Sequence, residues 1–221
     1  MGKRLSRKFY TRPTLTVAKD LLGKYLVRKI GKKKLIGKIV ETEAYIGPED
    51  RASHSFGGKI TERCKTEYLI GGHIYIYLCY GMYWMMNITT EKAGRPECVL
   101  IRALEPVITN IHESTTNFTN RHSRKFVPKF VEIRDLANGP GKLCNWLKLN
   151  KSFDKEDLTK SKRIWLEDPA PERARYGAGR GIKIKKSDIV AKKRIGIDYA
   201  GSWAKKPWRF YIKDNPFVSK K

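Results

Sequence analysis

Residues 35–46 read Leu-Ile-Gly-Lys-Ile-Val-Glu-Thr-Glu-Ala-Tyr-Ile, and Gly47-Pro48 follows at once. This long run of apolar and β-branched residues, ended by a turn pair, predicts a β-strand. Because side chains alternate between the faces of a strand, Glu41, Glu43 and Tyr45 share one face with Ile39. Two carboxylates and a tyrosine on one face are typical either of a half-solvated sheet edge or of a cleft.

Further strands and two helices are predicted on both sides of this stretch. The helices cover Pro13–Leu26, with Gly23 as a stop, and Lys142–Leu149 after Gly139-Pro-Gly. The strands cover Tyr25–Ile30, Ile74–Tyr80, Met82–Thr90, Cys98–Leu104, Ile182–Ile197 and Trp208–Ile212. Local strands with few helices and no βαβ rhythm favour an α+β fold.

Composition and charge limit the class of protein. The 221 residues include 47 Lys and Arg against 22 Asp and Glu, a formal net charge of +25. With 40% hydrophobic and 11% aromatic residues, the chain is no disordered basic tail. We expect a single domain over residues 1–221, with a basic end at residues 1–8 and a mobile loop at residues 109–129. So large a positive charge favours a polyanionic partner, nucleic acid first and an anionic membrane surface second.

Several other classes are disfavoured. No apolar run follows the basic start, and none is long enough to span a bilayer, so we expect neither a secretory signal nor membrane insertion. The four cysteines lie far apart and lack metal-ligand spacing, so we expect reduced, buried thiols and no metal site. The segment Gly139-Pro-Gly-Lys-Leu lacks the remainder of a phosphate-binding loop.

The segment 75–86 is unusually rich in aromatic and sulfur-containing side chains. Its strand bodies are expected to pack in the core, whereas the tip near Tyr80-Gly-Met-Tyr is hard to bury in a short hairpin. An apolar tip on a strongly basic protein suits a wedge between base steps of DNA. The basic segments Lys183–Lys186 and Lys192–Arg194, with the basic N-terminal end, are predicted to contact phosphates.

Arg102 lies inside an otherwise apolar predicted strand. A buried guanidinium needs anionic partners, and Glu41 and Glu43 are the candidates. The group is expected to form either a structural ion pair or a device that orients a catalytic carboxylate.

Taken together, these segments resemble the alkyladenine (3-methyladenine) DNA glycosylase family, the mammalian-type purine DNA glycosylases. The matching motifs run in order from about residue 8 to about residue 219 and cover nearly the whole chain. They are Val40-Glu-Thr-Glu-Ala-Tyr-Ile-Gly-Pro-Glu-Asp, Ala52-Ser-His-Ser, Ile74-Tyr-Ile-Tyr-Leu-Cys-Tyr-Gly-Met-Tyr, Met86-Asn87, Leu100-Ile-Arg-Ala-Leu-Glu-Pro, Gly139-Pro-Gly-Lys-Leu-Cys and Trp203-Ala-Lys-Lys-Pro-Trp-Arg-Phe-Tyr.

The resemblance implies one mixed domain around a curved, largely antiparallel, barrel-like sheet with flanking helices and a protruding DNA-inserting hairpin, acting without metal or cofactor. It assigns Glu43 to activating the attacking water and Arg102 to helping hold that water, whereas Glu41 is not the catalytic match. The implied pocket for the flipped base contains Tyr45, Ala52, His54, Tyr77 and Asn87. Tyr80 would replace the base in the duplex, with Met82 and Tyr83 beside it.

The function implied is hydrolytic excision of damaged purines from double-stranded DNA by a monofunctional enzyme of base excision repair. Its expected substrates are 3-methyladenine and 7-methylguanine, with hypoxanthine as a further candidate. We expect a monomer located inside the cell with the DNA, in cytoplasm, nucleoid or nucleus according to its source. Three alternatives stay open: a glycosylase that also cleaves the strand through a lysine Schiff base, a catalytically silent damage-recognition module, and a general nucleic-acid binder.

Overall fold

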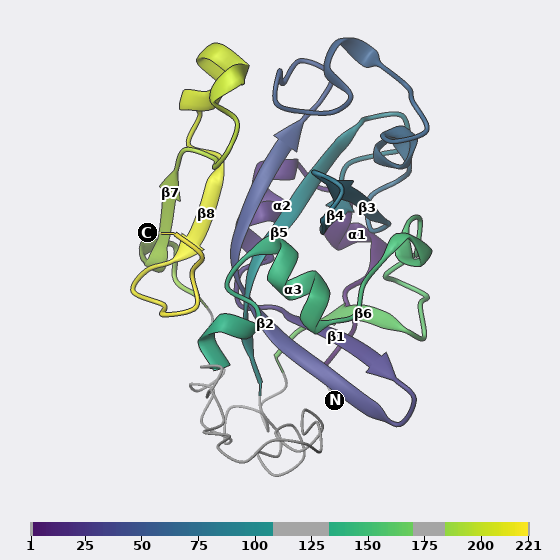
Figure 1. The fold of residues 1–221 in the computed structure, drawn as a ribbon, viewed down its shortest axis with the longest axis vertical. Helices are drawn as coiled ribbons and strands as arrows, with labels where there is room; N and C mark the ends of the chain where they lie inside the picture. The colour runs from purple at the N-terminus through teal and green to yellow at the C-terminus, as the bar shows by residue number, and fades with distance from the viewer. Residues whose placement is uncertain (1, 108–132, 170–183, 221) are drawn as a thin grey trace, which may run out of the picture.

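The computed structural model describes residues 2–107, 133–169 and 184–220 (Figure 1). The predicted mobile loop at residues 109–129 lies outside the described residues, as do residues 182 and 183 of the last-but-one predicted strand.

The fold is built on one sheet of eight strands, and every pairing in it is antiparallel. The order is β3-β4-β5-β2-β1-β6, and β8 joins β2 to β7. The strands are β1 (Tyr25–Ile30), β2 (Lys33–Ile46), β3 (Ile74–Cys79), β4 (Tyr83–Thr89), β5 (Glu97–Pro106), β6 (Ile164–Glu167), β7 (Ile189–Lys192) and β8 (Arg209–Ile212). The sheet curls, and the predicted α+β class is confirmed (Figure 1).

Strand β2 is the centre of the fold because it changes partners along its length. Its first half pairs with β1 from Lys33 to Lys38, and Glu41–Glu43 pairs with β8. Strand β5 pairs with the other edge of β2 from Gly37 to Ile46. The two glutamates therefore lie on a central strand, and the expectation of a half-solvated edge is wrong.

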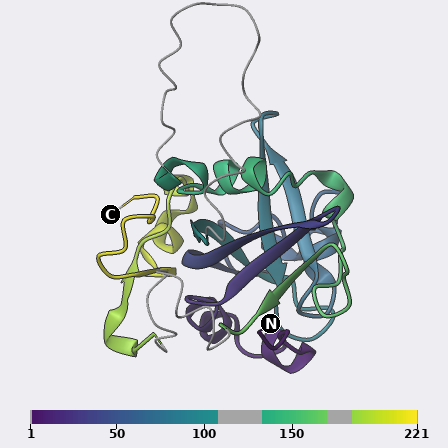
Figure 2. The ribbon, with the colours of Figure 1, turned by 90° about the horizontal axis from the view of Figure 1, so that it is seen from below.

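Two helices cover opposite faces of this sheet. Helix α2 (Thr14–Asp20) packs on β2 and β5 from behind, and α3 (Pro140–Trp146) packs on β4 and β5 in front (Figures 1 and 2). Val17 and Leu21 on one side and Leu143 and Leu147 on the other are fully buried in the main core. A short helix α1 (Arg7–Tyr10) precedes them. The remaining helical segments are single 3-10 turns at Phe56–Gly58, Lys65–Tyr68, Ile133–Leu136, Lys151–Phe153 and Lys186–Asp188, and a longer 3-10 segment at Asp198–Lys205.

Most predicted elements are confirmed, and three predictions are wrong or incomplete. The strand expected over residues 182–197 shrinks to β7, because a 3-10 turn precedes it and a second 3-10 segment follows. Strand β6 is not among the predicted strands. The basic N-terminal end is packed rather than free: Leu5 is buried, and Arg7 donates a hydrogen bond to Asp157 at 2.6 Å. In the described part of the chain, no helix is long and apolar enough to cross a membrane.

Candidate functional site

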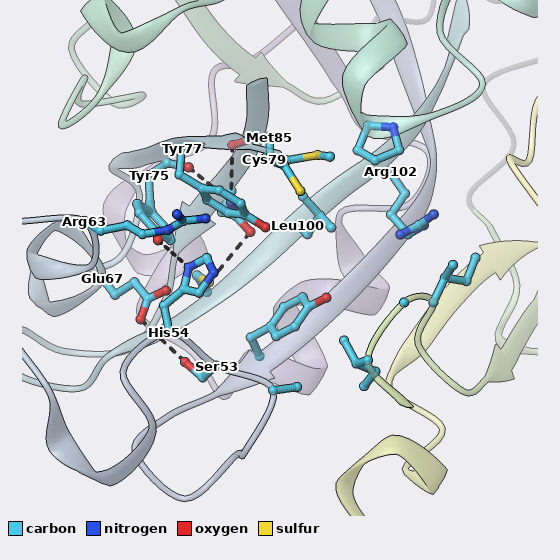
Figure 3. A pocket seen from close by; sticks show the side chains of 18 of the residues that line it. Ser53, His54, Arg63, Glu67, Tyr75, Tyr77, Cys79, Met85, Leu100 and Arg102 are labelled. Atoms are coloured by element: carbon cyan, nitrogen blue, oxygen red, sulfur yellow. Dashed lines mark hydrogen bonds between the residues drawn. The ribbon is translucent and has the colours of Figure 1, made fainter. Parts of the chain in front are cut away.

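A cavity of about 510 Å³ opens where the end of β2, the hairpin β3–β4 and the segment 195–199 meet (Figure 3). Its volume is in the range of small-ligand pockets. Tyr45, Ala52, His54, Tyr77, Asn87, Tyr80 and Arg102, all predicted site residues, line it. Five tyrosines and His54 give the lining an aromatic character, with aliphatic, sulfur-containing and polar side chains between them.

Glu43 lies behind this lining. Its side chain is fully buried and does not itself line the cavity, but three of its neighbours do. The Tyr45 hydroxyl donates to Oε2 at 2.9 Å, the backbone N–H of Ile195 donates to Oε1 at 2.8 Å, and Arg102 Nη1 lies 3.3 Å from Oε1. The carboxylate is thus held in one orientation at the cavity wall. Burial raises the pKa of the Tyr45 hydroxyl well above its usual value, so it remains a donor.

Arg102 joins both glutamates of the motif. In the pairing of β2 with β5, Val40 on β2 and Arg102 on β5 each have no partner residue. These two bulges offset each other, so the strands are in the same register before and after them. A bulge re-aims a side chain. The Arg102 Nε donates to Glu41 Oε1 at 3.2 Å while Nη1 faces Glu43. Burial alone would lower the pKa of Arg102, but the two carboxylates raise it overall, so the guanidinium stays charged.

Glu41 is a positioning residue rather than a part of the cavity. It is fully buried and also receives hydrogen bonds from Arg209 Nη1 at 2.8 Å and from the backbone N–H of Ser219 at 2.7 Å. Two arginines and a backbone amide therefore balance its charge. It does not line the cavity.

His54 and two tyrosines of β3 form the opposite wall. The His54 ring meets Tyr77 edge-on with the centroids 4.6 Å apart, and His54 Nδ1 lies 2.6 Å from the Tyr75 hydroxyl (Figure 3). Burial, helped by the nearby Arg63, lowers the pKa of His54 to about 4. The imidazole is therefore neutral at pH 7 and does not repel a cationic ligand.

Asn87 and Ala52 are both buried in the wall. The Asn87 amide donates to the backbone carbonyl of Tyr75 at 3.2 Å, and its Oδ1 lies 3.9 Å from the Cys98 thiol. These contacts fix the amide, so an approaching ligand meets a rigid polar group. Ala52 lies in the loop between β2 and β3, where a small side chain leaves room beside Tyr45.

The hairpin tip is exposed at the cavity mouth. Tyr80 is 88% exposed and adopts a φ of 50°, and Met82 is 67% exposed. The Met82 N–H closes the turn on the Cys79 carbonyl at 3.0 Å. Tyr83 is half-exposed because its ring packs against Gly141 of α3, and a Cβ on that glycine would lie 2.9 Å from the ring. Tyr80 lines the cavity, whereas Met82 and Tyr83 do not.

Other predictions for polar residues need correction. Arg194 is not phosphate-contacting surface: it is buried, pairs with both carboxylate oxygens of Asp50, and lies 4.7 Å from the Tyr45 ring centroid. It therefore fixes Tyr45. All four cysteines are free, but Cys79 is only half-buried and lines the cavity.

Several lining residues were not predicted as site residues, among them the polar side chains Arg63, Glu67 and Tyr199. Glu67 and Arg63 come from the irregular loop before β3, where no periodicity reveals which side chains point inward. Tyr199 lies in the 3-10 segment that was predicted neither as helix nor as strand. Within the described ranges, no group of three or more His, Cys, Asp or Glu side chains is placed to hold a metal ion.

Comparison with known proteins agrees with this geometry. The sequence pattern of the methylpurine-DNA glycosylase (MPG) family matches residues 8–216. One relative is a protein of Alkaliphilus oremlandii that is named "putative 3-methyladenine DNA glycosylase". It is 46% identical to this chain, and the match covers 99% of this chain and 100% of the relative. The human DNA-3-methyladenine glycosylase is 39% identical over 98% of this chain and 68% of its own. The mouse protein of the same name is 41% identical over 98% of this chain and 61% of its own. With nearly its whole length matched, the chain belongs to the methylpurine-DNA glycosylase family.

Proposed function

We propose that the protein is a 3-methyladenine DNA glycosylase, which hydrolyses the N-glycosidic bond of alkylated purines in double-stranded DNA and leaves an abasic site. The observation that carries the proposal is the buried carboxylate of Glu43, held by Tyr45, Ile195 and Arg102 at the wall of an aromatic cavity. A fixed carboxylate directly behind the lining of a cavity large enough for a small ligand is a candidate general base for activating a water.

In the proposed step, Glu43 takes a proton from a water that attacks C1′ of the sugar while the bond to the base breaks. Arg102 lies 3.3 Å from the same carboxylate and helps to orient that water. The developing positive charge on the sugar is stabilised by the nearby carboxylate.

Selectivity for alkylated purines has a physical basis in the same pocket. A methylated purine carries a positive charge, and the faces of Tyr45 and Tyr77 attract cations. Neutral His54 adds no repulsion, because its pKa is lowered to about 4. The fixed Asn87 amide is proposed to screen the exocyclic groups of the base.

Access to the base requires the nucleotide to leave the duplex, at a cost of a few kcal/mol. The exposed Tyr80 at the cavity mouth is proposed to take the place of the extruded base, with Met82 and Tyr83 beside it. The exposed lysines at 185, 186, 192 and 193 supply positive charge for phosphate contact.

Release of free base under single-turnover conditions tests the proposal. One duplex is globally methylated, which scores 3-methyladenine and 7-methylguanine, and a second is unmodified. Release of both methylpurines from the first and of no base from the second is expected. Tight lesion binding without release would instead assign a damage-recognition module, and binding without lesion preference would leave a general nucleic-acid binder. A covalent adduct trapped by borohydride would show a lysine Schiff base and overturn the water mechanism.

A further inference from the structure

Glu67 is a buried carboxyl group of the cavity wall that the proposed mechanism does not use. It lies in the 3-10 turn Lys65–Tyr68, lines the cavity, and is 2% exposed. Figure 3 shows it beside Ser53 and His54, on the opposite side of the lining from Arg102. The cavity thus has Arg102 on one side of its lining and a buried carboxyl group, Glu67, on the other.

The surroundings of Glu67 differ from those of Glu43. The Ser53 hydroxyl lies 3.5 Å from its Oε2, and no ion pair to it is present among the described residues. The titratable groups whose pKa is coupled to Glu67 are Asp50, Tyr68, Tyr75 and Cys98. Neutral His54 lies beside Glu67, and Arg63 of the same wall forms no ion pair with it among the described residues. None of the coupled groups supplies a positive charge, and the positive charge of Arg194 is taken up by Asp50.

This environment favours the protonated form. Burial raises the pKa of Glu67 to about 7, because hydrogen bonds from Ser55 and Ser53 only partly offset the loss of solvation and the Asp50 charge adds to it. At neutral pH the group is thus divided between acid and carboxylate. A carboxyl that can donate a proton in a base-binding cavity has the chemistry of a general acid.

We propose that Glu67 is the general acid for neutral damaged purines such as hypoxanthine, which it protonates as they leave. The proposal rests on the proposed glycosylase function. An alkylated purine is already cationic and leaves as a neutral base. A neutral purine would leave as an anion, so it needs a proton that the alkylated substrate does not.

The proton balance of the step is complete. Water attacks C1′ and loses a proton to the Glu43 carboxylate, while the electron pair of the glycosidic bond moves to the purine. The protonated Glu67 transfers its proton to a purine nitrogen or oxygen and becomes a carboxylate. After product release, Glu43 returns its proton to solvent and Glu67 regains one from solvent. No co-reactant is required.

The test compares two substrates in wild type, Glu67→Gln and Glu62→Gln. Single-turnover release of hypoxanthine is divided by release of 3-methyladenine from methylated DNA, so effects on folding and on Glu43 cancel. Glu62→Gln is the matched control, because it makes the same substitution in the same loop at a side chain that is 89% exposed. Glu67→Gln is expected to lower the ratio about 100-fold, and Glu62→Gln to leave it unchanged.

A pH series gives a second readout that needs no variant. Between pH 6 and 8 the wild-type ratio should fall about tenfold, as expected for an acid with a pKa of about 7, and the ratio for Glu67→Gln should be flat.

The outcomes separate the two proposals. If wild type releases 3-methyladenine but no hypoxanthine, or if Glu67→Gln slows both substrates equally or neither, the role of Glu67 is overturned and the glycosylase function stands. If wild type releases no methylpurine, the proposed function itself fails. A ratio that is independent of pH in wild type also overturns the role of Glu67.

Discussion

The single residue on which the proposed chemistry depends is Glu43. Glutamine at this position keeps the size of the side chain; its amide oxygen can still accept from Ile195 while its NH2 group donates to the Tyr45 hydroxyl, but it cannot take a proton from water. We expect Glu43→Gln to bind lesion DNA with near wild-type affinity and to release base 10²- to 10⁴-fold more slowly, about the contribution of a general base. Fluorescence anisotropy and single-turnover assays measure the two quantities. Wild-type release rates in this variant would remove Glu43 from the mechanism.

Glu41, in contrast to Glu43, is expected to matter for the stability of the fold rather than for the rate of base release. It is buried between Arg102 and Arg209, and removing one partner of a buried ion pair leaves uncompensated charge. We expect Glu41→Gln to cost about 3 kcal/mol of unfolding free energy, a fall in Tm on the order of 10 °C, while the loss of rate stays far below that of Glu43→Gln. Thermal melting followed by circular dichroism measures it. A Tm equal to that of Glu62→Gln would contradict the structural role.

Glu67 also has a consequence for stability. Its pKa in the folded protein, about 7, lies above the usual value, so the native state binds the proton more tightly than the unfolded chain. The stabilisation of the folded state by this proton is therefore fully present below about pH 4 and is lost as the pH rises through 7. The unfolding free energy of Glu67→Gln minus that of wild type is expected to be about 3 kcal/mol larger at pH 8 than at pH 4. Denaturant melts at the two pH values check the sign. An equal difference at both would show that Glu67 is ionised in the folded state.

At the scale of elements, the hairpin β3–β4 carries the proposed wedge on a stable base. Tyr80 is 88% exposed, so Tyr80→Ala removes few contacts of the folded chain. Stacking of an aromatic side chain on bases is worth on the order of 1–3 kcal/mol. We expect excision under subsaturating conditions to fall about 5- to 150-fold with an unchanged Tm. A loss of Tm, or no loss of excision, would contradict the proposed role of the tip.

Strands with a clear alternation of apolar and polar residues could be predicted from the sequence, but the neighbouring strands and the ion-pair partners of their side chains could not. The run 35–46 indicated a strand with Glu41, Glu43 and Tyr45 together, and the structure joins them through Arg102. Alternation does not tell whether a strand lies at an edge, so the full burial of both carboxylates was not predictable. Arg194 was misassigned for the same reason: sequence shows its charge, whereas its partner Asp50 is 144 residues away. Glu67 gave no signal, because an irregular loop has no period.

At the scale of the whole molecule, the net charge of +25 dominates the interaction with DNA. Each neutralised phosphate releases counterions, so log K falls linearly with log salt. Lys192 and Lys193 are exposed and close in sequence to Ile195 at the cavity. We expect the double change Lys192→Ala and Lys193→Ala to reduce the salt slope by about two, equally for damaged and undamaged duplexes. Titrations at several salt concentrations measure it. An unchanged slope would place the DNA elsewhere.

The change of partners along β2 makes the two walls of the cavity mechanically unequal. At Glu41–Glu43 the backbone is bonded to β5 on one edge and to β8 on the other. Amides paired in this way are among the last to exchange with deuterated solvent. In the opposite wall, Tyr75 and Tyr77 lie on β3, but His54 and Glu67 lie in the loop before it, whose regular structure is limited to short 3-10 turns. The loop that carries His54 and Glu67 is therefore held less firmly than the strand that carries Glu43. Purines of different outline can be accommodated by the loop while Glu43, which activates the attacking water in the proposed step, stays in place.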